Sequence, residues 1–280
     1  MLKICLLGER AIVDTGTGEV LVRSPRALAL VAFLAAHAPT PQSRTRIAAA
    51  FWPESGEQQA LTNLRRELHQ LRQVPGIGDS LQVTSGDLAW VDDPGCRVDL
   101  RVFRTELARA REAGSAPLRL AAARAALEAY AGDLLPGVYD DATLALRELL
   151  DRECADLCDL LVEAATDAGD PASALTAARR RVELQPLEET GYRTLIGLQA
   201  RLGDRAGAVS TYHHCATVLE RELGLQPDLS TRAVLDAALR RSDAAGSSTA
   251  SSDGPAVLRR HVAPAPDLVG RREQFAVLQG

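Results

Sequence analysis

The side chains best suited to chemistry in this 280-residue sequence are arginines and amides between residues 23 and 73. Seven arginines fall there against three glutamates, an excess of four positive charges in a chain whose net charge is −5. A guanidinium donates to phosphate oxygens and to guanine edges, and glutamine pairs with adenine. The acidic total argues against a protein that coats nucleic acid, but the local excess predicts one face that contacts double-stranded DNA.

A helix predicted over about residues 56–73 divides these side chains between two faces. Its leucines recur with a helical period and form one apolar face, made of Leu61, Leu64, Leu68 and Leu71. The opposite face and its flanks, with the start of the preceding helix, carry the predicted DNA-binding residues, which are Gln59, Thr62, Arg65, Arg66, His69, Arg72, Gln73, Arg44 and Arg46. A major-groove helix needs this division. A solvated amphipathic helix shows it too, so the neighbouring elements must decide.

Those neighbouring elements are predicted to be a strand meander, three helices and a hairpin. Ser24-Pro25 opens the first helix, because serine caps a helix and proline suits its first turn. Ser85-Gly86-Asp87 forms the turn of the hairpin. The strands are expected at residues 4–7, 11–13, 19–22, 81–84 and 88–91, and the helices at about 25–38, 43–51 and 56–73. This order is typical of a winged helix-turn-helix, whose hairpin contacts DNA beside the reading helix.

From about residue 98 to residue 239 the pattern is helical and contains an internal repeat. Ala168-Gly169-Asp170 with Ala174 recurs 34 residues later as Leu202-Gly203-Asp204 with Ala208, which is the tetratricopeptide period. The helices before residue 151 are expected to complete the stack, because two units are too few. The predicted fold class is mainly α with a small β part: an N-terminal winged helix-turn-helix followed by a tetratricopeptide-like all-α helical repeat domain.

Other clusters of reactive side chains favour structural roles. His213-His214-Cys215 are adjacent on a predicted helix, so they do not converge on one metal ion. Cys154 and Cys158 could share a helix face, but two thiols make an incomplete zinc site, and buried packing is favoured. Lys3 is the only lysine, so the chain has no phosphate-binding loop ending in Lys-Ser/Thr. We therefore predict no enzyme, no metal and no cofactor.

Composition favours a cytoplasmic protein. Hydrophobic residues make up 46% and charged residues 25%, as in soluble globular proteins. Five cysteines, an odd number, do not form the disulfide framework of a small secreted domain. The longest apolar stretch, residues 27–36, is far shorter than the roughly 20 residues that span a bilayer, and no signal peptide precedes it. Cytoplasmic localisation without a membrane partner is therefore expected.

Several segments match motifs of one known family. Near the N-terminus these are residues 46–53 (RIAAAFWP), Ala60, Asn63-Leu64 and Leu71-Arg72. Further along the chain they are Val98-Asp99-Leu100 with Phe103, and residues 185–189, 203–212 and 219–228 (LERELGLQPD). Over about residues 1–240 the chain resembles the Streptomyces antibiotic regulatory proteins, which join an OmpR-type winged helix to a bacterial transcriptional activation domain. That family usually has Gly-Tyr in the hairpin and an aromatic in the reading helix, where this chain has Gly86-Asp87 and Glu67.

The resemblance implies a sequence-specific transcriptional activator. Such a protein would bind direct repeats near promoters, as a homodimer of side-by-side protomers, and recruit RNA polymerase. The expected domains are a winged helix at 1–94, the activation domain at 97–240, a flexible linker rich in Ala, Ser, Gly and Pro at 241–266, and the start of a nucleotide-binding domain at 267–280. The alternative is a protein-interaction adaptor that uses its repeats, with a winged helix that does not bind DNA.

Overall fold

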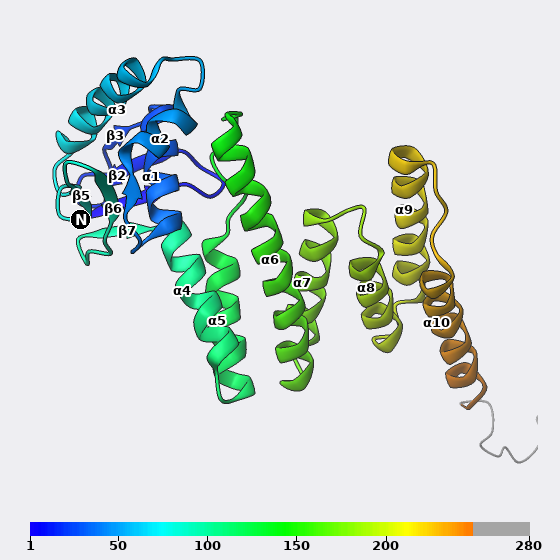
Figure 1. The fold of residues 1–280 in the computed structure, drawn as a ribbon. Helices are drawn as coiled ribbons and strands as arrows, with labels where there is room; N and C mark the ends of the chain where they lie inside the picture. Colours follow the sequence, from blue (N-terminus) through cyan, green and yellow to red (C-terminus); the bar gives the residue numbers. More distant parts are fainter. Residues whose placement is uncertain (249–280) are drawn as a thin grey trace, which may run out of the picture. The chain divides into compact units, whose positions relative to one another are not determined.

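Four short strands form the first sheet of the computed structural model, which describes residues 1–248 (Figure 1). β1 (Leu2–Cys5), β2 (Ala11–Asp14) and β3 (Val20–Val22) make the predicted antiparallel meander. A strand that the sequence did not predict, β7 (Cys96–Val98), pairs in parallel with β1 and gives the order β3-β2-β1-β7. Three residues are too few for a recognisable alternation, and the partner strand is far away in sequence.

Three helices and a second sheet follow the order predicted for a winged helix-turn-helix. The helices are α1 (Pro25–His37), α2 (Arg44–Phe51) and α3 (Glu57–Arg72). The Ser24 hydroxyl caps α1 by accepting from the Ala27 N–H at 3.4 Å. β5 (Leu81–Val83) and β6 (Asp87–Trp90) form the predicted hairpin, and the unpredicted β4 (Gln42–Ser43) pairs with β6 on its other edge.

The helices that follow pack in sequence order, each on the next from α4 to α9. They are α4 (Asp99–Glu112), α5 (Ala116–Ala129), α6 (Asp141–Asp167), α7 (Pro171–Leu184), α8 (Glu189–Arg201), α9 (Arg205–Leu223) and α10 (Leu229–Ser248). This arrangement confirms a mainly α fold with small sheets and a helical repeat.

The 34-residue repeat corresponds to two helix pairs, α6–α7 and α8–α9. Gly169 and Gly203 both have positive φ, at 69° and 79°, in the turn between the helices of a pair, where glycine avoids a Cβ clash. Asp170 and Asp204 then cap the following helices by accepting from backbone N–H groups. Ala174 and Ala208 are 1% and 0% exposed, so the predicted close approach of paired helices is confirmed.

One hydrophobic core runs through most of the described chain, from Leu2 in β1 to Leu219 in α9. A smaller cluster of Ile196, Ala208 and Ala238 attaches α10. Among residues 1–248, no helix combines the length and apolar character needed to cross a membrane. Helix α10 extends to Ser248, into the segment predicted as a linker, and the predicted domain at 267–280 lies outside the described residues.

Candidate nucleic-acid interface

Helix α3 buries the apolar face that its sequence predicts. Ala60, Leu64, Leu68 and Leu71 are buried, and Leu61 is half-buried. These side chains join the core beneath α1 and α2, against which α3 packs. The orientation of α3 is therefore set by its leucines, and its polar side chains must point outward.

All seven residues of the predicted set that belong to α3 and its C-cap are exposed: Gln59, Thr62, Arg65, Arg66, His69, Arg72 and Gln73. Two of them make local hydrogen bonds, since Thr62 Oγ1 donates to the Gln58 carbonyl at 2.8 Å and Gln59 Nε2 donates to Asn63 Oδ1 at 3.1 Å. The arginines of α3 form no ion pair with any residue from 1 to 248. Their guanidinium groups are thus available to an external anion.

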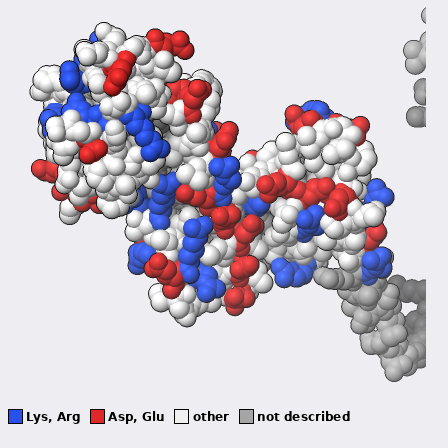
Figure 2. All heavy atoms as spheres, in the orientation of Figure 1, with Lys and Arg blue, Asp and Glu red and all other residues white. Residues whose placement is uncertain are grey.

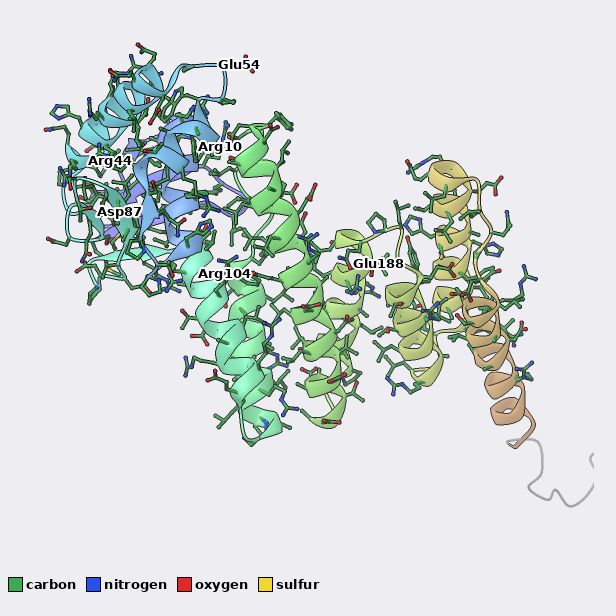
Figure 3. All side chains as sticks on the ribbon, in the orientation of Figure 1. Arg10, Arg44, Glu54, Asp87, Arg104 and Glu188 are labelled. Carbon is green, nitrogen blue, oxygen red and sulfur yellow. The ribbon has the colours of Figure 1, made fainter. Side chains whose placement is uncertain are left out.

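Arg44 and Arg46 differ in their surroundings. Arg46 is exposed, whereas Arg44 is half-buried and its Nη1 donates to the Thr84 carbonyl at 3.2 Å. The Arg44 backbone N–H also donates to the Gly86 carbonyl at 2.9 Å, and Figure 3 shows Arg44 beside Asp87 of the hairpin. Arg44 therefore holds the hairpin turn against the start of α2, a role that its position in the sequence did not indicate.

A second arginine of the basic segment supports the turn between α2 and α3. Arg26 Nη1 donates to the Phe51 carbonyl at 2.9 Å, and its guanidinium lies 5.6 Å from the centre of the Trp52 ring. Such a cation–π contact fixes both partners. Arg26 thus stabilises the turn between α2 and α3.

Charge is distributed unevenly over the visible surface. Figure 2 shows a group of Lys and Arg side chains across the N-terminal part, with Asp and Glu side chains around it, whereas both signs alternate over the repeat helices. Glu67 is the acidic exception within α3: it is half-buried, and its Oε2 is buried without a hydrogen-bond partner among the described residues. The N-terminal part therefore carries basic side chains on its visible face, and α3 exposes three arginines.

A sequence model of the bacterial transcriptional activator domain matches residues 98–239, half of the chain. The chain belongs to the bacterial transcriptional activator domain family. No curated protein matches it. The matched residues include α4 to α9, so the repeat helices described above are this activator domain.

A solved structure shares the fold of this chain. Mycobacterium tuberculosis EmbR, solved in complex with a low-affinity phosphopeptide, aligns with a TM-score of 0.62 and 22% identity over 89% of this chain and 70% of that chain. The C-terminal TPR-containing domain of an FK506-binding protein from Plasmodium falciparum gives a TM-score of 0.38 and 11% identity over 54% of this chain and 97% of that one.

The activator domain is joined to the N-terminal part by hydrogen bonds as well as by apolar packing. Arg104 on α4 donates from Nη1 to the Ala36 carbonyl at the end of α1 and makes two 2.9 Å bonds to Glu153 on α6 (Figure 3). The Leu135 N–H donates to the Leu6 carbonyl at 2.8 Å. These partners lie far apart in sequence, so no local pattern indicated them.

Asp99, at the start of α4, binds the chain after β1. Its Oδ2 accepts from the N–H groups of Leu6 and Leu7 at 2.8 and 2.9 Å, and its Oδ1 accepts from the Leu100 N–H at 2.7 Å. Burial raises the pKa of this carboxyl to about 6, against the lowering effect of the three donors. The junction motif containing Asp99 therefore fixes the activator domain to the first sheet.

The remaining reactive clusters have structural surroundings. Cys154 and Cys158 are buried on α6, which confirms their predicted packing role. His213 and His214 are exposed while Cys215 is buried, so the three side chains lie in different environments. Within residues 1–248, no group of three or more His, Cys, Asp or Glu side chains is placed to hold a metal ion.

Proposed function

We propose that this protein is a sequence-specific DNA-binding activator of the Streptomyces antibiotic regulatory type, with an OmpR-like winged helix at residues 1–94 and an activator domain at 97–240. One observation carries the proposal: α3 buries its leucines and leaves its arginines, glutamines and histidine exposed, and the arginines form no ion pair with other described residues. This is the division that a major-groove helix requires.

Each part of the face has a proposed role. Gln59, Thr62, Arg66, His69 and Gln73 face base edges, because they lie opposite the buried leucines. Arg65, Arg72 and Arg46 contact phosphates from the flanks. Arg44 holds the hairpin turn and directs it toward the DNA backbone.

The activator domain supplies the remaining functions of the proposal. Family membership supports recruitment of RNA polymerase, and resemblance supports binding to direct repeats as a homodimer in the cytoplasm. No nucleotide or metal is required by this mechanism, because binding rests on hydrogen bonds and charge alone.

The test is a gel-shift titration of the full chain on genomic fragments that it enriches. Arg66→Ala is expected to cost about 1–3 kcal/mol, with relaxed specificity at one base position, because a bidentate base contact is lost. Arg65→Ala should reduce the slope of log affinity against log salt by about one, since one phosphate contact is lost. Arg179→Ala, an exposed arginine on α7, is the control.

Unchanged affinity and salt slope in both α3 variants would remove α3 from the interface. If the wild-type chain shifts no DNA even at low salt and instead co-purifies with a stoichiometric protein partner, the adaptor function replaces the proposal.

A further inference from the structure

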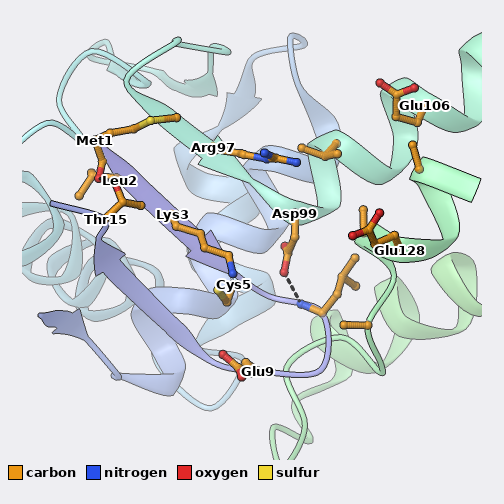
Figure 4. A pocket seen from close by; sticks show the side chains of 15 residues that line it. Met1, Leu2, Lys3, Cys5, Glu9, Thr15, Arg97, Asp99, Glu106 and Glu128 are labelled. Carbon is orange, nitrogen blue, oxygen red and sulfur yellow. Dashed lines mark hydrogen bonds between the residues drawn. The ribbon is translucent and has the colours of Figure 1, made fainter. Parts of the chain in front are cut away.

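A cavity of about 710 Å³ lies between the first sheet and the helix pair α4–α5 (Figure 4). One wall comes from β1, β7 and the loop after β1, and the other from the activator domain. Volumes of about 300–1,000 Å³ are typical of pockets that enclose small molecules. The cavity is thus large enough for a ligand that touches both parts of the chain.

Two cations stand side by side on the sheet wall. Lys3 and Arg97 are direct partners in the parallel register of β1 and β7, so both side chains leave the same face of the sheet. Like charges directly opposite each other are unfavourable unless an anion lies between them. Neither forms an ion pair with a carboxylate in the described part of the chain, although the Lys3 ammonium lies near the Cys5 thiol and the Asp99 carboxylate.

Carboxylates border the same cavity from other elements. Glu128 projects from α5 and Glu9 from the loop after β1, and neither has a hydrogen bond or ion pair with a residue of the described chain (Figure 4). Glu106 on α4 pairs with Arg109 at 2.8 Å, and the Asp99 oxygens already accept backbone N–H groups. Two carboxylates without an ion pair among the described residues therefore line the same cavity as Lys3 and Arg97.

Small side chains keep this cavity open. Helix α5 contributes Ala125 and Ala129 to the wall, and Ala131 follows them. The cavity is open to solvent, because Lys3, Arg97 and Glu128 on its walls are exposed, and the alanines leave room between these walls. Small side chains therefore line the same cavity as the charged residues that form no ion pair with another described residue.

We infer that this cavity binds a zwitterionic small molecule. Its carboxylate or phosphate accepts from Lys3 and Arg97, and its protonated amine donates to Glu128 and Glu9. Such a ligand satisfies both sets of charges that the protein leaves apart. Because the two walls belong to different parts of the chain, ligand binding also stabilises their contact.

Triglycine is a suitable probe, with N-acetyltriglycine lacking the ammonium and triglycinamide lacking the carboxylate. By ligand-observed NMR with the full chain, triglycine is expected to bind with a Kd of about 1 mM, as its size allows. Each half-charged analogue should bind at least about tenfold more weakly, because one wall then lacks a partner. The assay contains no DNA, so its outcome is independent of the proposed DNA binding.

Variants locate the site. Lys3→Gln and Arg97→Gln should each weaken triglycine binding about tenfold or more, and Ala129→Leu should weaken it by narrowing the cavity beside Glu128. Arg179→Gln, which is remote from the lining residues, should bind as the wild type does. Thermal melts establish that each variant is folded.

The inference is overturned if wild-type chain shows no triglycine binding at about 20 mM, twentyfold above the expected Kd. Equal binding of the analogues, or binding unaffected by the Lys3, Arg97 and Ala129 substitutions, overturns it as well.

Discussion

Asp99 accepts backbone N–H groups from Leu6 and Leu7, which are far away in sequence, and from its neighbour Leu100. Burial raises the pKa of its carboxyl to about 6, because this effect is larger than the lowering of the pKa by the three donors. The folded state therefore holds a proton on Asp99 at a pH where the unfolded chain has already released it. Through this carboxyl, the stability of the junction between α4 and the first sheet depends on pH.

The sign of that coupling is testable. Between about pH 4 and pH 6 the folded state binds more protons at Asp99, so its contribution to the free energy of unfolding falls as pH rises, by up to about 3 kcal/mol. Asp99→Asn removes this titration. Urea unfolding of both proteins from pH 4 to pH 7 should show the wild type losing stability relative to the variant, with exposed Asp156→Asn as a control. A difference that is constant with pH, or that grows in favour of the wild type, contradicts the assignment.

At the scale of elements, a few side chains fix how helices meet. Arg104 connects α4 to the end of α1 through the Ala36 carbonyl. It also connects α4 to α6 through the Glu153 carboxylate, and both side chains of this ion pair are partly buried. Arg147 similarly donates to three carbonyls between α5 and α6, at residues 134, 135 and 138. Guanidinium groups suit this role because one side chain has five donors in a rigid plane.

Arg104→Ala is expected to lower the free energy of unfolding by about 2 kcal/mol, because Glu153 and the Ala36 carbonyl lose a charged donor. Denaturant titration measures this change. The matched control is Arg152→Ala, an exposed arginine on the same helix as Glu153. In a double-mutant cycle, Arg104→Ala with Glu153→Ala should cost less than the sum of the single changes, since neither charge is then left unpaired. Strict additivity would show that the pair does not stabilise the junction.

At the scale of the whole molecule, the first 242 residues form one compact unit with a shared core. Ile4 and Ile12 of the first sheet belong to the same buried cluster as Phe103 and Leu150 of the activator domain. A continuous core resists independent unfolding of its halves, unlike two domains joined by a linker.

Scanning calorimetry of residues 1–242 should therefore give a single transition in which the winged helix and the first repeat helices unfold together. The Arg104→Ala variant should shift that transition without splitting it. Two well-separated transitions in the wild type would mean that the junction contributes little to stability.

Spacing along the chain predicts the features that depend on neighbours three or four positions apart. The buried leucines and exposed arginines of α3 and the Ser24 cap follow from such local spacing, and the 34-residue repeat follows from the recurrence of one local motif. These residues interact mainly within one helix or one helix pair, so their pattern survives in the linear chain.

Which distant segments meet follows from the packing of whole elements. The pairing of β7 with β1, the use of Arg44 and Arg26 as supports, and the cavity bordered by Lys3 and Arg97 each join residues that are separated by tens of positions. Such contacts depend on how whole elements pack and on which charges remain unpaired afterwards, and neither is encoded in a local period.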